Sequence, residues 1–140
     1  PPAFEVLELM KKLVKWYRES KKSMHPFELA VLLHTKFVTI HPFVDGNGRV
    51  ARALMNFVLD KYGYPTLYLG LENREGYLDA VADGNKEVYQ PIIDFMYDVY
   101  INQHKVILNE IYNKIRNGEV DVLPEMNDLF KEFLKLKAKS

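Results

Sequence analysis

Apolar residues recur every three or four positions along most of this chain, which is the spacing of one helix face. The segments with this spacing are 4–20, 26–41, 49–61, 91–116 and 124–137. A shorter helix is expected after Asn73, with that residue as its N-cap, and only 64–71 is predicted to be extended. The pattern therefore predicts an all-α fold, with a compact helical core over residues 1–117 and a helical C-terminal tail of unknown role over 118–140.

Composition excludes several classes of protein. The 140 residues include no cysteine, so a disulfide scaffold, a thiolate metal site and a cysteine nucleophile are ruled out. Nineteen basic and 19 acidic side chains give zero formal net charge, which argues against nucleic acid as a partner. No apolar run approaches the roughly 18 residues of a membrane span. With no membrane segment or signal peptide visible, we expect a cytoplasmic protein.

The segment His41-Pro-Phe-Val-Asp-Gly-Asn-Gly-Arg-Val-Ala-Arg52 joins two of the predicted helices. Gly46 and Gly48 lack Cβ atoms, so the backbone can take positive φ and turn its N–H groups toward one point. The partial positive charge of the following helix N-terminus is directed at the same place. These features together predict a cradle for an anion.

The charged residues of this segment specify which anion. Arg49 and Arg52 are three residues apart, so both can project from one side of the first helical turn. Guanidinium groups match the oxygens of phosphate, and Asp45 suits a Mg²⁺ that bridges phosphates. His41 can act as a neutral base near physiological pH. The combination predicts phosphoryl or nucleotidyl transfer.

This segment resembles the signature of the Fic-domain family, His-Pro-Phe-x-Asp/Glu-Gly-Asn-Gly-Arg-x-x-Arg, without a substitution. The similarity continues on both sides of the signature and covers roughly residues 1 to 100. The flanking positions that carry it are Leu33, His34, Ile40, Leu54, Met55, Gly63, Tyr64, Pro65, Arg74, Tyr77, Asn85 and Pro91.

The resemblance implies an enzyme, a protein adenylyltransferase that moves AMP from ATP, its co-substrate, to a Ser, Thr or Tyr hydroxyl of a protein. It implies His41 as the general base, Asp45 as the Mg²⁺ ligand and Phe43 as a buried anchor of the loop. The implied nucleotide-binding residues are Gly46, Asn47 with its side-chain amide, Gly48, Arg49, Arg52, Tyr77 and Asn85. Gly48 also favours AMP transfer, because relatives that phosphorylate their targets usually have lysine there.

Two other functions stay open on the sequence. The chain could be a nucleotide-binding regulatory or interaction module without turnover, although the intact His41 speaks against this. The same site could also run in reverse and remove AMP, an activity that in the family normally needs an inhibitory glutamate. That glutamate follows Ser or Thr by four residues, whereas Tyr68 and Leu71 precede Glu72 and Glu75 at that distance.

The partners implied by the resemblance are therefore a protein substrate bearing a hydroxyl, and either a separate inhibitory partner or an inhibitory helix outside this sequence. A homodimer is a further alternative. Outside the signature, His34 lies on the apolar side of its helix and is interpreted as a hydrogen-bonded core histidine, not a ligand.

Overall fold

The computed structural model describes residues 1–119, and these residues form helices without any strand. The elements are α1 (Ala3–Ser20), α2 (Pro26–Ile40), α3 (Asn47–Lys61), a 3₁₀ turn η1 (Leu71–Asn73), α4 (Arg74–Gly84) and α5 (Gln90–Arg116). The predicted all-α fold class is confirmed. The predicted helix over 124–137 lies outside the described residues, and the division at residue 117 stays a prediction.

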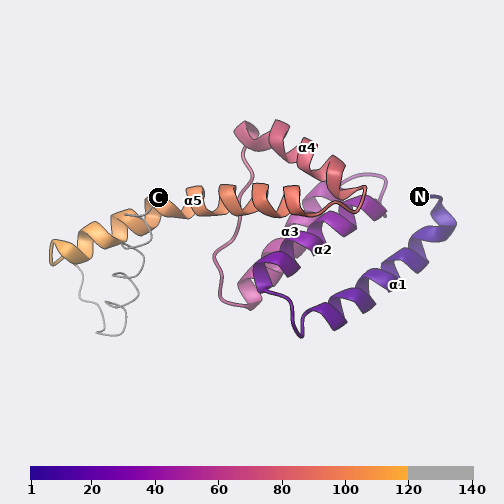
Figure 1. Cartoon of the computed structure of the whole chain (residues 1–140), viewed down its shortest axis with the longest axis horizontal. Helices are drawn as coiled ribbons and strands as arrows, with labels where there is room; N and C mark the ends of the chain where they lie inside the picture. Colours follow the sequence, from indigo (N-terminus) through magenta and orange to yellow (C-terminus); the bar gives the residue numbers. More distant parts are fainter. Residues whose placement is uncertain (120–140) are drawn as a thin grey trace. The chain divides into compact units, whose positions relative to one another are not determined.

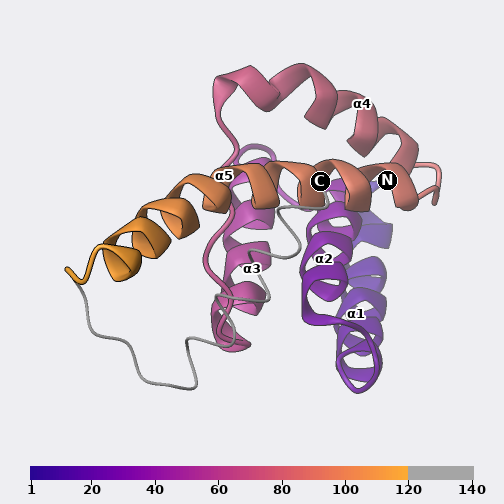
Figure 2. The same ribbon diagram turned by 60° about the vertical axis from the view of Figure 1, so that its left-hand side comes forward.

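Helix α2 lies at the centre of the compact unit Pro1–Tyr100 and packs against α1, α3 and α4 (Figures 1 and 2). Ten of its 15 residues are buried, because it is apolar on nearly all sides. The core that surrounds it is contributed by every helix of the unit. Its largest fully buried aliphatic and methionine side chains are Leu29, Val31, Met55, Val58, Leu59, Ile92 and Met96.

The helices begin and end where local signals place them. His25 stands at the N-cap of α2, and its Nδ1 accepts a hydrogen bond from the Phe27 amide at 3.2 Å, while Pro26 takes the first helical position. Gly63 follows α3 with φ of 78°. The amides of Gly63 and Tyr64 donate to the carbonyls of Asp60 and Leu59, which completes a Schellman motif.

The predicted start of α4 after Asn73 is confirmed, but the capping bond of that residue is absent. Asn73 occupies the N-cap position of α4, but its side chain caps nothing and its backbone is already helical, with φ of −93° and ψ of −3°. The turn η1 explains the difference, because it leads directly into α4 and removes the extended backbone that a capping side chain needs.

Lys36 ties α1 and α2 to the segment before α5. Its ammonium lies 5.0 Å from the centre of the Trp16 ring and 4.8 Å from that of Tyr89, and it donates to the Tyr89 hydroxyl at 3.1 Å. Two aromatic faces around one ammonium are a favourable cation–π arrangement. None of the helices described between residues 1 and 119 is long and apolar enough to cross a membrane.

The close packing of α4 on α2 gives a test of the fold. A Cβ atom built on Gly84 would lie 2.5 Å from Thr35 Cγ2, so we predict that Gly84→Ala forces the helices apart. Urea unfolding should show a loss of about 1–3 kcal/mol of stability. The matched control is Asp79→Ala at an exposed position of α4, which should leave stability within about 0.5 kcal/mol. Equal stability of Gly84→Ala and the wild type would contradict this packing.

Candidate functional site

The site begins at the end of α2 with His41. This exposed residue has φ of 53° and ψ of 59°, in the left-handed region, and its amide donates to the Phe37 carbonyl at 3.1 Å. A non-glycine residue in this conformation is uncommon, and Pro42 follows it directly. This strained backbone ends α2 abruptly. The imidazole of His41 is exposed to solvent at the start of the turn.

Asn47 closes the turn between α2 and α3. Its Oδ1 accepts from the Phe43 amide at 2.9 Å, and its Nδ2 donates to the Phe43 carbonyl at 2.7 Å. Asn47 itself is buried. The side-chain amide therefore holds the loop through its oxygen and one of its N–H donors. Its predicted contact with phosphate stays a prediction.

Phe43 also differs from the prediction. Its side chain is 52% exposed, so it is not a buried anchor, although its ring lies 6.2 Å from that of Phe37. The two hydrogen bonds to Asn47 fix the backbone of Phe43, and this makes a buried ring unnecessary for holding the loop.

The two glycines have different roles. Gly46 stands at the N-cap of α3 with φ of 83°, so the positive φ predicted for this glycine is confirmed. Gly48 lies inside α3 without positive φ, so the prediction for its backbone is wrong. Its lack of a side chain makes room, because a Cβ atom on Gly48 would lie 3.2 Å from an Arg52 guanidinium nitrogen. Gly46 makes room for Arg49 in the same way, because a Cβ atom on Gly46 would lie 3.3 Å from Arg49 Nη2.

Arg49 and Asp45 form an exposed ion pair across the first turn of α3. Arg49 Nη2 lies 3.3 Å from Asp45 Oδ2, and their side chains are 75% and 91% exposed. Within residues 1–119, no cluster of three or more His, Cys, Asp or Glu side chains could hold a metal ion. A single exposed carboxylate still fits Mg²⁺, which keeps most of its waters and is bound through one or two carboxylates and the phosphates of a substrate.

Arg52 points toward α4, where it meets Tyr77. Burial raises the pKa of the Tyr77 hydroxyl, and the charge and hydrogen bonding of Arg52 oppose that rise. The same hydroxyl lies 2.9 Å from His34 Nε2. His34 is fully buried, which confirms its interpretation as a hydrogen-bonded core histidine.

A hollow of about 520 Å³ lies beside Arg52 and Tyr77. Arg74 and the segment from Leu67 to Leu71 contribute to its lining, together with Asn56, Asn73 and Leu78. The Asn56 side chain holds this segment, since it accepts from the Leu67 amide at 2.7 Å and donates to the Leu67 carbonyl at 3.0 Å. Sequence reasoning missed Asn56, whose one signal is a polar side chain among the apolar neighbours Met55 and Phe57.

Asn85 is not part of the lining of this hollow. It stands at the C-cap of α4, and its Oδ1 accepts a hydrogen bond from the Thr39 hydroxyl at 2.7 Å. This bond places Asn85 next to the end of α2, because Thr39 stands two residues before His41. Its predicted contact with adenine stays a prediction.

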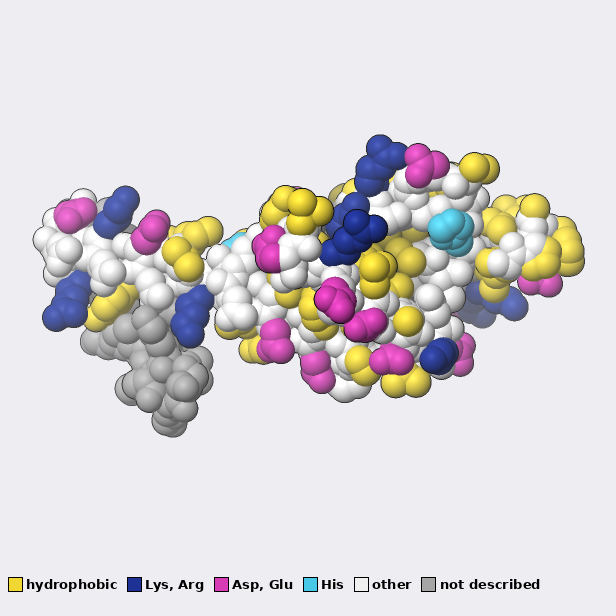
Figure 3. Space-filling model, turned by 90° about the horizontal axis from the view of Figure 1, so that it is seen from above, with side chains coloured by type: hydrophobic (Ala, Val, Ile, Leu, Met, Phe, Trp, Pro, Cys, Tyr) yellow, Lys and Arg dark blue, Asp and Glu magenta, His cyan; other side chains and the backbone are white. Residues whose placement is uncertain are grey.

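Basic side chains gather close to an exposed histidine on the face of the molecule drawn in Figure 3.

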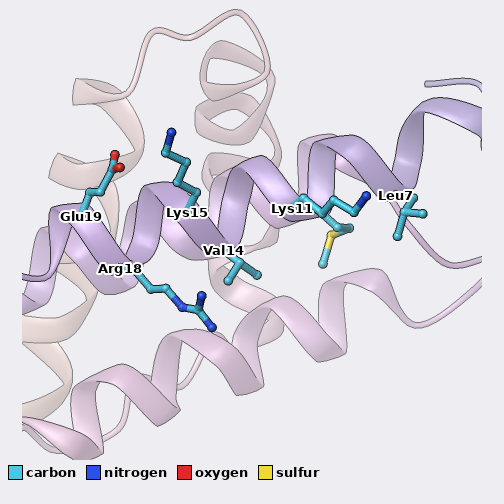
Figure 4. A pocket seen from close by; sticks show the side chains of 7 residues that line it. Leu7, Lys11, Val14, Lys15, Arg18 and Glu19 are labelled. Atoms are coloured by element: carbon cyan, nitrogen blue, oxygen red, sulfur yellow. The ribbon is translucent and has the colours of Figure 1, made fainter.

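A second hollow, of about 590 Å³, has only α1 side chains among its described lining residues. Leu7, Lys11 and Val14 line it along one side of the helix (Figure 4). No residue of the 41–52 segment is among these lining residues.

Comparison with known proteins gives the same family from sequence and from structure. Residues 1–59 match the Fic/DOC family. The chain is 40% identical over 91 residues to the protein adenylyltransferase Fic of Drosophila ananassae, covering 64% of this chain and 18% of that protein. It is 40% identical over 98 residues to the protein adenylyltransferase Fic of Nematostella vectensis, covering 69% of this chain and 23% of that one.

Solved structures with this architecture also carry Fic domains. A Fic-domain-containing signalling protein from Bacteroides thetaiotaomicron superimposes with a TM-score of 0.65 and 35% identity, over 71% of this chain and 43% of that one. Fic-1 from C. elegans superimposes with a TM-score of 0.68 and 31% identity, over 74% of this chain and 32% of that one. The fold of this chain is thus that of a Fic domain.

The chain belongs to the Fic/DOC family. It spans only about a fifth of the length of the curated relatives it matches.

The buried His34 predicts how stability depends on pH. Burial, and then the charge of Arg52, lower the pKa of His34 from its ordinary 6.5 to about 4. Between these two values the unfolded chain binds a proton that the folded chain does not, so stability falls as pH falls from 6.5 toward 4. The slope from this group is about 1.4 kcal/mol per pH unit.

The measurement is urea unfolding of the wild type and of His34→Gln from pH 7.5 to pH 4. The variant removes this titrating group but leaves the other three histidines in place. We expect the difference in unfolding free energy between the two proteins to change with pH below 6.5 and to be constant above it. A constant difference over the whole range would contradict the lowered pKa.

Proposed function

We propose that this chain transfers AMP from ATP to a hydroxyl group of a protein. The observation that carries the proposal is the turn between α2 and α3. It joins an exposed imidazole, His41, to a helix N-terminus on which two glycines make room for two arginines. The names of its relatives as protein adenylyltransferases support the choice of reaction.

The start of α3 is the proposed binding place for the triphosphate. The first N–H groups of a helix have no partner within the helix and favour an anion. Gly46 and Gly48 leave the backbone open to a close approach, and Arg49 and Arg52 add two positive charges on the same turn. Arg52 has less freedom than Arg49, because it lies between Gly48 and Tyr77.

The proposed reaction is an in-line displacement. The target hydroxyl oxygen attacks the α-phosphorus of ATP, the bond from that phosphorus to the bridging oxygen breaks, and pyrophosphate leaves. His41 accepts the hydroxyl proton as the general base, through an imidazole that is exposed to solvent. Arg52 stabilises the negative charge that develops on the leaving group.

Asp45 is the proposed Mg²⁺ ligand, and its exposed carboxylate in the loop just before α3 fits a cation shared with phosphates. Bound there, Mg²⁺ would neutralise charge on the phosphates. The nucleoside is proposed to occupy the hollow beside Arg52, with Tyr77 as one of its walls.

The test uses two preparations of ATP, one labelled at the α-phosphate and one at the γ-phosphate. Each is incubated with Mg²⁺, this chain and a cell lysate, and the label in protein is followed by gel and by mass spectrometry. Compared with the same lysate without this chain, we expect additional label from the α-phosphate only. His41→Ala should lose at least about a hundredfold in the rate of transfer, because the general base is removed, and should still bind ATP by calorimetry.

His104→Ala is the control, because it removes a histidine outside the 41–52 segment. It should transfer at the wild-type rate. Full transfer by His41→Ala would eliminate the proposed mechanism. Label from the γ-phosphate would instead indicate phosphorylation, and ATP binding without label in any protein would favour a binding module.

A further inference from the structure

A line of polar groups runs from the backbone of α2 to Arg52. The Thr35 hydroxyl donates to the Val31 carbonyl at 2.9 Å, and His34 Nδ1 faces Thr35 Oγ1 in a long contact of 3.5 Å. On its other side, His34 Nε2 lies 2.9 Å from the Tyr77 hydroxyl, which Arg52 approaches. His34 and Thr35 are both fully buried, so no solvent competes for the contact between them.

The two ends of the line fix the direction of every hydrogen bond in it. A backbone carbonyl only accepts and a guanidinium only donates. Because the Thr35 proton is used on Val31, Thr35 Oγ1 can only accept from His34, which places the His34 proton on Nδ1. His34 Nε2 then accepts from the Tyr77 hydroxyl, and the lone pairs of that oxygen are left for Arg52.

The opposite tautomer does not satisfy these groups. A proton on His34 Nε2 would leave the Nδ1 lone pair facing the Thr35 oxygen, whose own proton points to Val31. A buried acceptor without a donor is unfavourable. A neutral His34 is also what the site requires, and burial together with the Arg52 charge lowers the pKa of His34 to about 4.

We propose that His34 is a positioning residue of the nucleotide site, which acts through Tyr77 to hold the Arg52 guanidinium at the hollow. This inference rests on the proposed function, in which Arg52 binds the phosphates. Arg52 has many rotamers when it is exposed, and a fixed guanidinium binds an anion more strongly than a mobile one. The Arg52 guanidinium lies over Gly48 on one side and meets Tyr77 of α4 on the other.

Two substitutions of His34 separate positioning from mere packing. His34→Leu fills a similar volume but offers no acceptor to Tyr77. His34→Gln offers a side-chain oxygen that can take the place of Nε2. Tyr77→Phe removes the hydroxyl between His34 and Arg52. We expect His34→Leu and Tyr77→Phe each to raise the Kd for ATP about tenfold, and His34→Gln to stay within about threefold of the wild type.

The same variants are then measured with adenosine and in an Arg52→Ala background. Adenosine has no phosphate, so its affinity should not change in His34→Leu. In the Arg52→Ala background, His34→Leu should add no further loss of ATP affinity, because the residue it positions is gone. An equal loss with and without Arg52, or a weaker affinity for adenosine, would reduce His34 to a packing residue and overturn the proposal.

A readout without nucleotide tests the line directly. In protein labelled with ¹⁵N at histidine, the ring nitrogens of the four histidines are distinguished by NMR, and His34→Leu identifies the signals of His34. We expect the proton on Nδ1 at pH 7. A proton on Nε2 would overturn the inference even if ATP binds, whereas a proton on Nδ1 in a chain that does not bind ATP would overturn the proposed function and leave the hydrogen-bonded line intact.

Discussion

The side chain of Asn47 holds together the turn on which the proposed site depends. Residues 41–46 have no regular secondary structure, so their own backbone does not fix their course. The two hydrogen bonds between Asn47 and Phe43 supply that constraint from the first residue of α3. They hold the loop so that the exposed His41, the Asp45 carboxylate and the Arg49 guanidinium lie on one short stretch of chain around one helix N-terminus.

Helix α3 uses the same device twice. Asn47 holds the segment that enters the helix, and Asn56 holds Leu67 in the segment that leaves it. Arg52 lies between the two asparagines in the sequence and meets Tyr77 of α4. Residues of α3 therefore hold both the proposed phosphate site and the hollow beside it, and α3 itself packs against the apolar α2. A rigid helix is a better support for such groups than loops alone.

Much of this architecture could be predicted from the sequence, because its signals are local. Pro26 and Gly63 mark helix ends by their own backbone chemistry, and the three- and four-residue apolar spacing identifies the segments that are helical. The Gly46 conformation was predictable for the same reason, since a tight turn before a helix needs positive φ.

The remainder depended on partners that the sequence does not name. An asparagine in a loop motif can face a ligand or the backbone, and only the folded turn shows that Asn47 binds Phe43. Gly48 was expected to bend the backbone, but it is helical and makes room for Arg52. The contacts of His34 with Tyr77, and of Asn85 with Thr39, join residues more than 40 positions apart, which no periodicity encodes.

The dependence of the site on the Asn47 side chain is tested most directly by the affinity of Asn47→Ala for ATP. Calorimetry would compare it with the wild type and with Asn113→Ala, an exposed asparagine of α5, at a temperature where all three are folded. Loss of both hydrogen bonds should lower stability by about 1–3 kcal/mol and weaken ATP binding at least about tenfold, while Asn113→Ala matches the wild type. Wild-type affinity in a destabilised Asn47→Ala would contradict the account, because the turn would then bind nucleotide without its constraint.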